Sequence, residues 1–302
     1  MFGWPLGVFT SLDEGLGIHF DVLAKLAIPT IHLHAPSAAH RSAAEAARAA
    51  DELRRLNVEV TCVFAGFVGE SYTDIPTVER TVGLVPMETR RERVSELKEI
   101  ANYTAQIGVH AVGLHLGFVS HDTQSGEYQE LLDVTRDVCD YCGVKELAVH
   151  LETGQEPAEL LEEFLTDVER PNLYVNFDPA NMILYGCGEP IPALKRLGRF
   201  VRSVHCKDAK WSKKPGKTWG TEMPLGAGDV NFAEFLATLA EIRYAGPLTI
   251  EREIPQEPER QEQEIRHAVN LFGFQRGRSG LARREDTPRH DLGHHALRKV
   301  LA

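Results

Sequence analysis

Glu146–Glu152, which reads ELAVHLE, is the segment that most directly predicts the fold. Side chains alternate between the two faces of a strand, so Val149 and the two leucines share one face, whereas His150 and Glu152 share the other. A strand in a doubly wound sheet, buried on both faces, would be apolar throughout. One apolar face beside a face that becomes polar towards its C-terminal end instead indicates a closed barrel, with the apolar face turned to surrounding helices.

Apolar segments of this kind recur along the whole chain, and helical patterns lie between most of them. The expected strands are Leu6–Thr10, Thr30–His34, Val58–Ala65, His110–Leu116, Glu146–Glu152, Leu173–Asp178, Val201–Lys207 and Leu248–Glu251. The expected helices are Leu16–Ala27, Arg41–Leu56, Thr89–Ile107, Tyr128–Cys142, Pro157–Val168, Ile191–Leu197, Phe232–Ile242 and Glu257–Phe272. Strands that alternate with helices pair in parallel through crossovers. The chain is therefore predicted to form one α/β domain, a (β/α)8 TIM barrel.

Two segments depart from the repeat. Lys207–Gly228, rich in Lys, Gly and Trp, is predicted to be a long loop. The barrel is expected to occupy residues 1–274, and residues 275–302 form a polar, Arg-rich C-terminal extension that is mobile or packs on a neighbouring subunit of a homo-oligomer. Three histidines in that extension could bind a metal, but we interpret them as part of a solvated tail; they are His290, His294 and His295.

Composition restricts the class of partner. The chain has 302 residues and a formal net charge of -11, and an acidic surface repels phosphate backbones, so no nucleic-acid partner is expected. No apolar run reaches the ~20 residues needed to cross a bilayer, and the N-terminus does not resemble a secretory signal. Five scattered cysteines indicate reduced thiols and a cytoplasmic location. The Cys139–Cys142 CxxC has no second pair to complete a zinc ribbon.

The C-terminal ends of the strands carry the candidate chemistry, because TIM-barrel active sites lie at that end. The last four strands end in a carboxylate or imidazole, namely Glu152, Asp178, His205 and Glu251. Three carboxylates and one imidazole suit Mn²⁺, Mg²⁺ or Co²⁺, with Zn²⁺ as a further option. A hard cation prefers about six ligands, which leaves two positions for adjacent sugar oxygens. Unrelated turns or caps would explain each residue singly, but not their shared position on the inward face.

Further residues are candidates for substrate binding. His115 and His34 also lie at strand ends on the inward face. Each could bind a substrate hydroxyl or have a structural role next to the metal ligands. Lys207 could neutralise an oxyanion or pair with a metal-binding carboxylate. Trp211 and Trp219 could stack on a sugar face or simply pack the loop. His150, one layer below Glu152, is interpreted as an interior histidine.

Five segments resemble a known superfamily. They are VHLETG (149–154), NFDPAN (176–181), VHCKDAKW (204–211), LGAGDVNF (225–232) and LTIERE (248–253). They look like the xylose-isomerase-like superfamily of sugar phosphate isomerases and epimerases, and the resemblance extends roughly from Leu6 to Phe274. It implies one divalent metal ion, often manganese, at Glu152, Asp178, His205 and Glu251. By similarity to ketose 3-epimerases, Glu152 and Glu251 would also be the catalytic acid and base.

The sequence departs from parts of the superfamily pattern. Asn181 stands where the epimerases usually carry a His that grips the substrate, and it is itself a candidate for substrate binding. Lys207, Asp208 and Lys210 occupy a region where the epimerases place an Arg. The AP endonucleases of the same superfamily hold several zinc ions with extra histidines. Asn181 and Asn231 stand at two of those positions, so a DNA-repair nuclease is disfavoured.

The resulting expectation is a metal-dependent isomerase or epimerase of a small sugar or sugar phosphate. A metal-stabilised enediolate would form after one glutamate removes the proton next to the carbonyl. The alternative enzyme is a lyase or dehydratase on a keto-sugar, keto-inositol or keto-glycoside, because loss of a β-hydroxyl shares the same first step. A barrel that binds a ligand without turnover is the remaining alternative.

Overall fold

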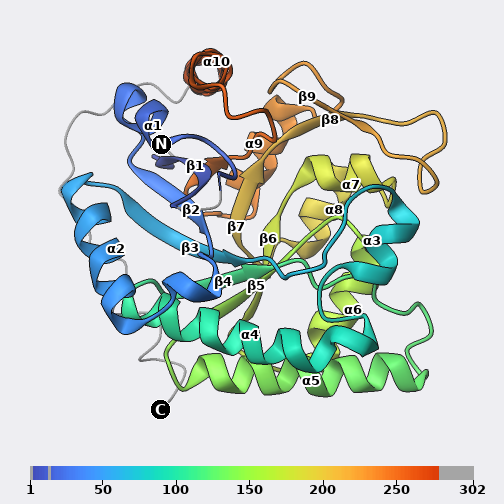
Figure 1. Ribbon diagram of the computed structural model, residues 1–302. Helices are drawn as coiled ribbons and strands as arrows, with labels where there is room; N and C mark the ends of the chain where they lie inside the picture. The colour runs from blue at the N-terminus through green and yellow to red at the C-terminus, as the bar shows by residue number, and fades with distance from the viewer. Residues whose placement is uncertain (1–2, 13–14, 279–302) are drawn as a thin grey trace.

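The computed structural model describes residues 3–12 and 15–278 of the chain (Figure 1). Eight parallel strands close into a barrel in the order β1-β10-β7-β6-β5-β4-β3-β2. The strands are β1 (Leu6–Ser11), β2 (Thr30–His34), β3 (Glu59–Ala65), β4 (Ala111–Leu114), β5 (Ala148–Glu152), β6 (Leu173–Phe177), β7 (Val201–Cys206) and β10 (Leu248–Ile250). The predicted (β/α)8 barrel is therefore confirmed.

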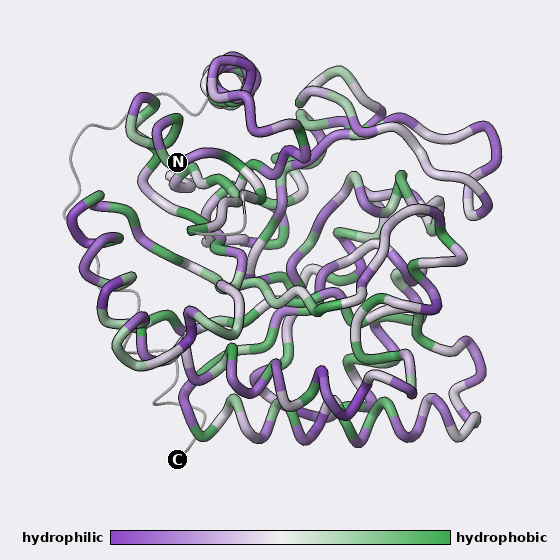
Figure 2. The backbone as a smooth tube through the Cα atoms, in the orientation of Figure 1, coloured by the Kyte–Doolittle hydropathy of each residue, from purple (hydrophilic) through white to green (hydrophobic). Residues whose placement is uncertain are grey.

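Helices surround the strands on the outside of the barrel (Figure 1). They are α1 (Phe20–Leu26), α2 (Ala43–Arg55), α3 (Ile75–Thr81), α4 (Met87–Gln106), α5 (Gly126–Gly143), α6 (Ala158–Val168), α7 (Pro179–Tyr185), α8 (Pro190–Leu197), α9 (Phe232–Glu241) and α10 (Pro258–Arg278), with a 3-10 turn at Ala38–His40. Along α4 and α5 the hydropathy alternates, as expected for helices with one face towards the barrel and one towards water (Figure 2).

Two short helices were not expected from the sequence, α3 and α7. Each begins at an Asp whose side chain caps the first turn and has a Pro within that turn, at Asp74 and at Asp178. Proline is favoured there because its missing N–H is not needed in the first turn. The Asp-Pro pair at 178–179, compatible with a simple turn in the sequence, therefore starts a helix that lies beside the mouth of the barrel.

The segment Lys207–Gly228 is not a loop throughout, so that prediction was wrong in part. It contains an antiparallel hairpin of β8 (Asp208–Lys210) and β9 (Thr221–Met223). The carboxylate of Asp208 accepts hydrogen bonds from the backbone N–H groups of Gly226, Gly228 and Val230, at 2.8, 2.9 and 3.1 Å. A Cβ at Gly228 would lie 2.1 Å from Asp208 Oδ1, so the backbone approaches this carboxylate as only glycine allows.

The barrel interior is filled by side chains rather than open. Cys62, Phe64 and Ala111 form a buried cluster against which Phe9 and Ala148 pack. The Phe64 ring fits because Gly113 has no side chain; a Cβ there would lie 2.6 Å from the ring. This apolar plug contacts the polar residues nearer the mouth, since the ring centroids of Phe64 and His205 are 4.8 Å apart. The plug therefore forms an apolar floor beneath the candidate site.

The C-terminal part of the chain is described only up to Arg278. Helix α10 continues into the first residues of the expected extension. Residues 279–302, which include His290, His294 and His295, lie outside the described residues, so the extension and its role in a homo-oligomer stay predictions. Among the residues that the structure describes, no helix combines the length and apolar character that a membrane span requires.

Replacing Asp208 with alanine tests whether its carboxylate holds the hairpin and the following turn. The substitution leaves several backbone donors without a partner, so we expect Asp208→Ala to lower the free energy of unfolding by about 3 kcal/mol. Hydrogen–deuterium exchange should accelerate at Gly226, Gly228 and Val230. Asp229→Ala is the control, because the exposed side chain of Asp229 accepts a single hydrogen bond within the described part of the chain, from the backbone N–H of Trp211. Equal effects of the two substitutions would contradict this role.

Candidate metal centre

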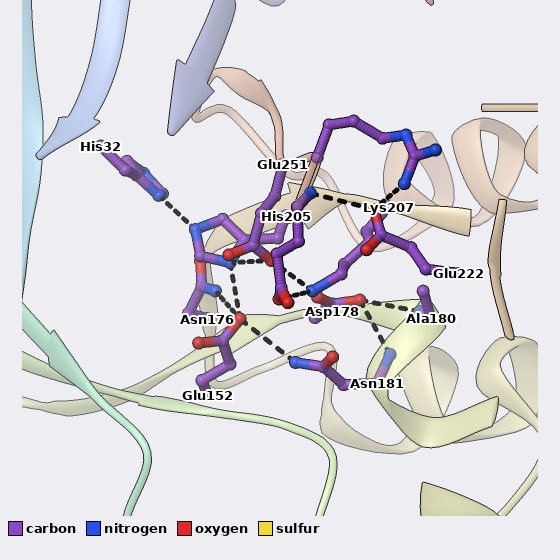
Figure 3. Close-up of polar contacts among 12 residues, drawn as sticks. His32, Glu152, Asn176, Asp178, Ala180, Asn181, His205, Lys207, Glu222 and Glu251 are labelled. Carbon is purple, nitrogen blue, oxygen red and sulfur yellow. Dashed lines mark hydrogen bonds and ion pairs between the residues drawn. The ribbon is translucent and has the colours of Figure 1, made fainter. Parts of the chain in front are cut away.

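Four side chains converge at the C-terminal mouth of the barrel (Figure 3). Glu152 is the last residue of β5, Asp178 directly follows β6, His205 lies in β7 and Glu251 directly follows β10. These strands are neighbours in the barrel, so their C-terminal ends meet. One ligand atom from each side chain lies within 4.8 Å of the others. The structure therefore brings together the four residues that the sequence singled out, in a buried cluster that could hold a metal ion.

The two carboxylate oxygens of Asp178 have different roles, one in capping a helix and one in the cluster. Oδ1 accepts hydrogen bonds from the backbone N–H groups of Ala180 and Asn181, at 2.7 and 3.0 Å, and so caps α7. Oδ2 is buried and has no hydrogen-bond partner among the described residues. Burial raises the pKa of Asp178 well above its usual value, and Glu251 and Glu152 add to that rise against the opposing effect of Lys207. A buried, unpartnered carboxylate oxygen fits a cation ligand.

His205 shows that the cluster attracts positive charge. Its Nδ1 lies 2.5 Å from Glu152 Oε1 and 3.4 Å from Glu251 Oε2. Burial alone would lower the pKa of His205, but the two glutamates outweigh burial and raise the pKa to about 10. The protein groups by themselves therefore hold an imidazolium between the carboxylates. A divalent cation would satisfy the same charge and take the Nδ1 lone pair of a neutral imidazole.

Lys207 pairs with a carboxylate of the cluster, as one of its two predicted roles requires. Its side chain is 3% exposed, and Nζ lies 3.3 Å from Glu251 Oε2 and also contacts Glu253. Burial raises the pKa of Glu251, but Lys207 and His205 outweigh it and hold that pKa well below its usual range. Lys207 therefore keeps Glu251 ionised, which a metal ligand or a general base requires.

His115 and Asn181 both contact Glu152. His115 Nε2 is 3.2 Å from Glu152 Oε2, and the side-chain amide of Asn181 donates to Glu152 Oε1 at 3.5 Å. The amide of Asn176 donates to the same oxygen at 3.3 Å. Both His115 and Asn181 also line the pocket in front of the cluster. Two of the residues predicted to bind substrate thus connect the cluster with that pocket.

The pocket has a volume of about 270 Å³ and opens directly onto Glu251. One wall is aromatic, made by Tyr72, Tyr185 and Trp219, and the rings of Tyr185 and Trp219 meet edge-on with centroids 4.6 Å apart. The buried indole Nε1 of Trp219 has no hydrogen-bond partner among the described residues. An apolar wall with a few polar groups is typical of a site for a small molecule.

Comparison with known proteins places this architecture in a family. The family described as xylose isomerase-like TIM barrel matches residues 20–272. The chain belongs to this family. No curated protein matches the sequence at a significant level.

Solved structures agree with the assignment to the xylose isomerase-like family. A xylose isomerase domain protein from Planctomyces limnophilus is 50% identical, with a TM-score of 0.89 over 92% of this chain and 99% of that chain. A D-psicose 3-epimerase from Clostridium cellulolyticum H10, solved with D-tagatose, is 15% identical, with a TM-score of 0.67 over 89% and 98%. A xylose isomerase-like TIM barrel protein from Mycobacterium smegmatis, in complex with magnesium, is 14% identical, with a TM-score of 0.64 over 90% and 98%.

Two residues predicted to bind substrate lie elsewhere in this xylose isomerase-like barrel. The ring of His34 packs against Phe9, with centroids 6.3 Å apart. Trp211 directly follows β8, at the start of the loop that joins the two hairpin strands, and its backbone N–H donates to Asp229. Neither lines the pocket. Trp219, the other tryptophan of the same segment, is the one that does.

The sequence reasoning also missed several residues of the site. His32 lies 2.9 Å from His205, and its position two residues before His34 on the inward face could have revealed it. Tyr72, Glu222 and Glu253 come from loops or the hairpin, where no periodic pattern indicates which way a side chain points. Only the folded chain brings those three to the pocket.

Asp178→Asn separates the metal-binding role of this residue from its structural role. Asparagine keeps the oxygen that caps α7 but replaces the unpartnered oxygen with an amide. We expect the metal-free variant to be at least as stable as the wild type, because a buried carboxyl becomes neutral. Addition of Mn²⁺ at a hundredfold excess over its dissociation constant should stabilise the wild type by about 2.7 kcal/mol and leave Asp178→Asn unaffected.

Thermal denaturation with Mn²⁺ and with EDTA measures this difference. The matched control is Asp74→Asn, because Asp74 caps α3 by accepting the Thr77 N–H at 2.8 Å but lies outside the cluster. That variant should keep the full response to metal. Metal-dependent stabilisation of Asp178→Asn equal to that of the wild type would exclude Asp178 as a ligand.

Proposed function

We propose that this protein is a divalent-metal-dependent sugar isomerase or epimerase that works by proton transfer. The observation that carries the proposal is the buried cluster of Glu152, Asp178, His205 and Glu251, which opens onto a pocket of sugar size. These four residues would hold one ion, Mn²⁺ by preference, with Mg²⁺, Co²⁺ or Zn²⁺ as substitutes. The relatives solved with D-tagatose and with magnesium support the same assignment.

The two glutamates are the proposed acid and base. A bound divalent cation would polarise the carbonyl group of a ketose in the pocket. Glu251, kept ionised by Lys207, is suited to remove the proton from the neighbouring carbon. Glu152, with His115 and Asn181 in contact, is suited to return a proton from the other side. Return to the opposite face of the same carbon gives an epimer, and return to the neighbouring carbon gives an isomer.

The surroundings of the pocket favour an unphosphorylated sugar. TIM barrels frequently bind phosphate with the loops after the seventh and eighth strands. In this chain those loops, after β7 and β10, bring the carboxylates Glu222 and Glu253 to the pocket. The neighbouring cations are already paired, Lys207 with Glu251 and Glu253, and Arg252 with Glu222 and Glu264. Carboxylates accept hydrogen bonds from sugar hydroxyl groups, whereas they repel a phosphate.

Deuterium uptake from D₂O tests the reaction. With Mn²⁺ we expect mass-spectrometric uptake of one deuterium into a ketose substrate, and no uptake with EDTA. Glu152→Gln and Glu251→Gln should each reduce the rate by about a hundred- to ten-thousand-fold, the usual contribution of general acid–base catalysis. The control is Glu156→Gln, since Glu156 is a buried carboxyl beyond the cluster that accepts the Val119 N–H.

The mass of the product distinguishes the alternatives. Deuterium uptake without loss of water supports isomerisation or epimerisation. Metal-dependent loss of one water indicates the dehydratase, and release of the aglycone alcohol from a keto-glycoside indicates the lyase. If metal-loaded wild type neither exchanges protons nor releases water or an aglycone across a panel of ketoses, keto-inositols and keto-glycosides, the proposed chemistry is wrong.

A ketose and its terminal phosphate together test whether the enzyme prefers an unphosphorylated sugar. We expect kcat/KM for a free ketose to exceed that for its terminal phosphate at least about tenfold, which corresponds to about 1.4 kcal/mol. Glu253→Gln releases Lys207 from one partner and should reduce this ratio severalfold. Glu257→Gln, at an exposed position near the start of α10, is the control and should leave the ratio unchanged. A wild type that prefers the phosphate would contradict the preference.

A further inference from the structure

His32 contacts the imidazole of the cluster from behind. It lies in β2, three strands from β7 around the barrel, and its side chain is fully buried. Its Nδ1 is 2.9 Å from His205 Nε2 (Figure 3). The ring of His32 stacks on Phe64, with centroids 5.3 Å apart and an angle of 29° between the planes. The apolar plug therefore fixes the orientation of a histidine that touches a candidate metal ligand.

The contact restricts which nitrogen of His205 carries a proton. Of two ring nitrogens at hydrogen-bond distance, one donates and the other accepts. If Nε2–H of His205 donates to Nδ1 of His32, the lone pair of His205 Nδ1 is directed at Glu152 and Glu251, where a cation would bind. If His32 donated instead, the proton of a neutral His205 would lie on Nδ1 and block that position.

We propose that His32 is a positioning residue, which accepts the Nε2–H of His205 and so presents Nδ1 of His205 to the metal ion. This inference rests on the proposed metal centre. Histidine ligands usually donate their second N–H to a carboxylate, a backbone carbonyl or water. A neutral imidazole in that position orients the ligand without adding a further negative charge to a cluster that already holds three carboxylates.

The barrel contains a matched control, His150. It is also buried in the interior, 5% exposed, and its Nδ1 lies 2.8 Å from Ser203 Oγ rather than from a metal ligand. Burial lowers the pKa of both His32 and His150, so both are neutral imidazoles in the lumen. They differ in their hydrogen-bond partner. The same substitution made at each position therefore distinguishes an effect on the orientation of the metal ligand from an effect on packing inside the barrel.

The test measures metal affinity rather than turnover. His32→Phe keeps the ring on Phe64 but removes the acceptor, and we expect it to weaken Mn²⁺ and Co²⁺ binding about 10- to 100-fold in competition with a chelator, the usual effect of losing such a partner. His32→Asn, whose Oδ1 can replace Nδ1 as acceptor, should bind within about threefold of the wild type. His150→Phe should leave the affinity unchanged. The visible absorption of bound Co²⁺ should change only in His32→Phe.

The outcomes separate this inference from the function on which it rests. Circular dichroism in EDTA establishes that each variant is folded, and His32→Leu replaces His32→Phe if the latter does not fold. Wild-type affinity in the variant without an acceptor would overturn the role of His32, as would an equal loss in His150→Phe. A folded wild type that binds neither ion would overturn the proposed metal centre itself, and the positioning role with it.

Discussion

The mutual repulsion of three buried carboxylates is the constraint on which the rest of this site depends. Glu152 and Asp178 lie at the ends of the neighbouring strands β5 and β6, and Glu251 follows β10, which only β7 separates from β6, so closing the barrel brings the three together. Like charges at such separations in a buried site are strongly unfavourable unless positive charge lies between them. His205 and Lys207 supply part of this positive charge, because the pKa of His205 is raised and that of Glu251 is lowered. The unpartnered oxygen of Asp178 is the position at which a cation would supply the rest.

Contacts with the surrounding fold hold these side chains in position. The aromatic rings of the plug, Phe9 and Phe64, pack against the two histidines His32 and His205 below the cluster. Helix α7 begins at Asp178, so one carboxylate both caps a helix and faces the cluster. The hairpin of β8 and β9, held at its base by Asp208, carries Glu222 to the pocket. Stability and function therefore use the same few polar groups.

The proposed chemistry follows from the different neighbours of the two glutamates in the cluster. On one side Lys207 holds Glu251 ionised, and on the other His115 and Asn181 contact Glu152, so the two glutamates have different surroundings. Groups of the same type in different environments are what acid–base catalysis requires. The aromatic wall of Tyr185 and Trp219 and the carboxylates at the rim suit a neutral, hydroxyl-rich molecule.

The sequence by itself determined the barrel and its four candidate ligands, because strand periodicity is a local property that fixes which face of each strand a residue occupies. Once eight parallel strands are expected, the positions of Glu152, Asp178, His205 and Glu251 at successive C-terminal ends follow. The contact of His32 with His205 joins residues 173 positions apart, and only the tertiary structure decided it. The same holds for the pocket wall, where Trp219 rather than Trp211 faces the site because the hairpin fixes its direction. Contacts between distant loops depend on how each loop closes over the barrel, which no local pattern of side chains encodes.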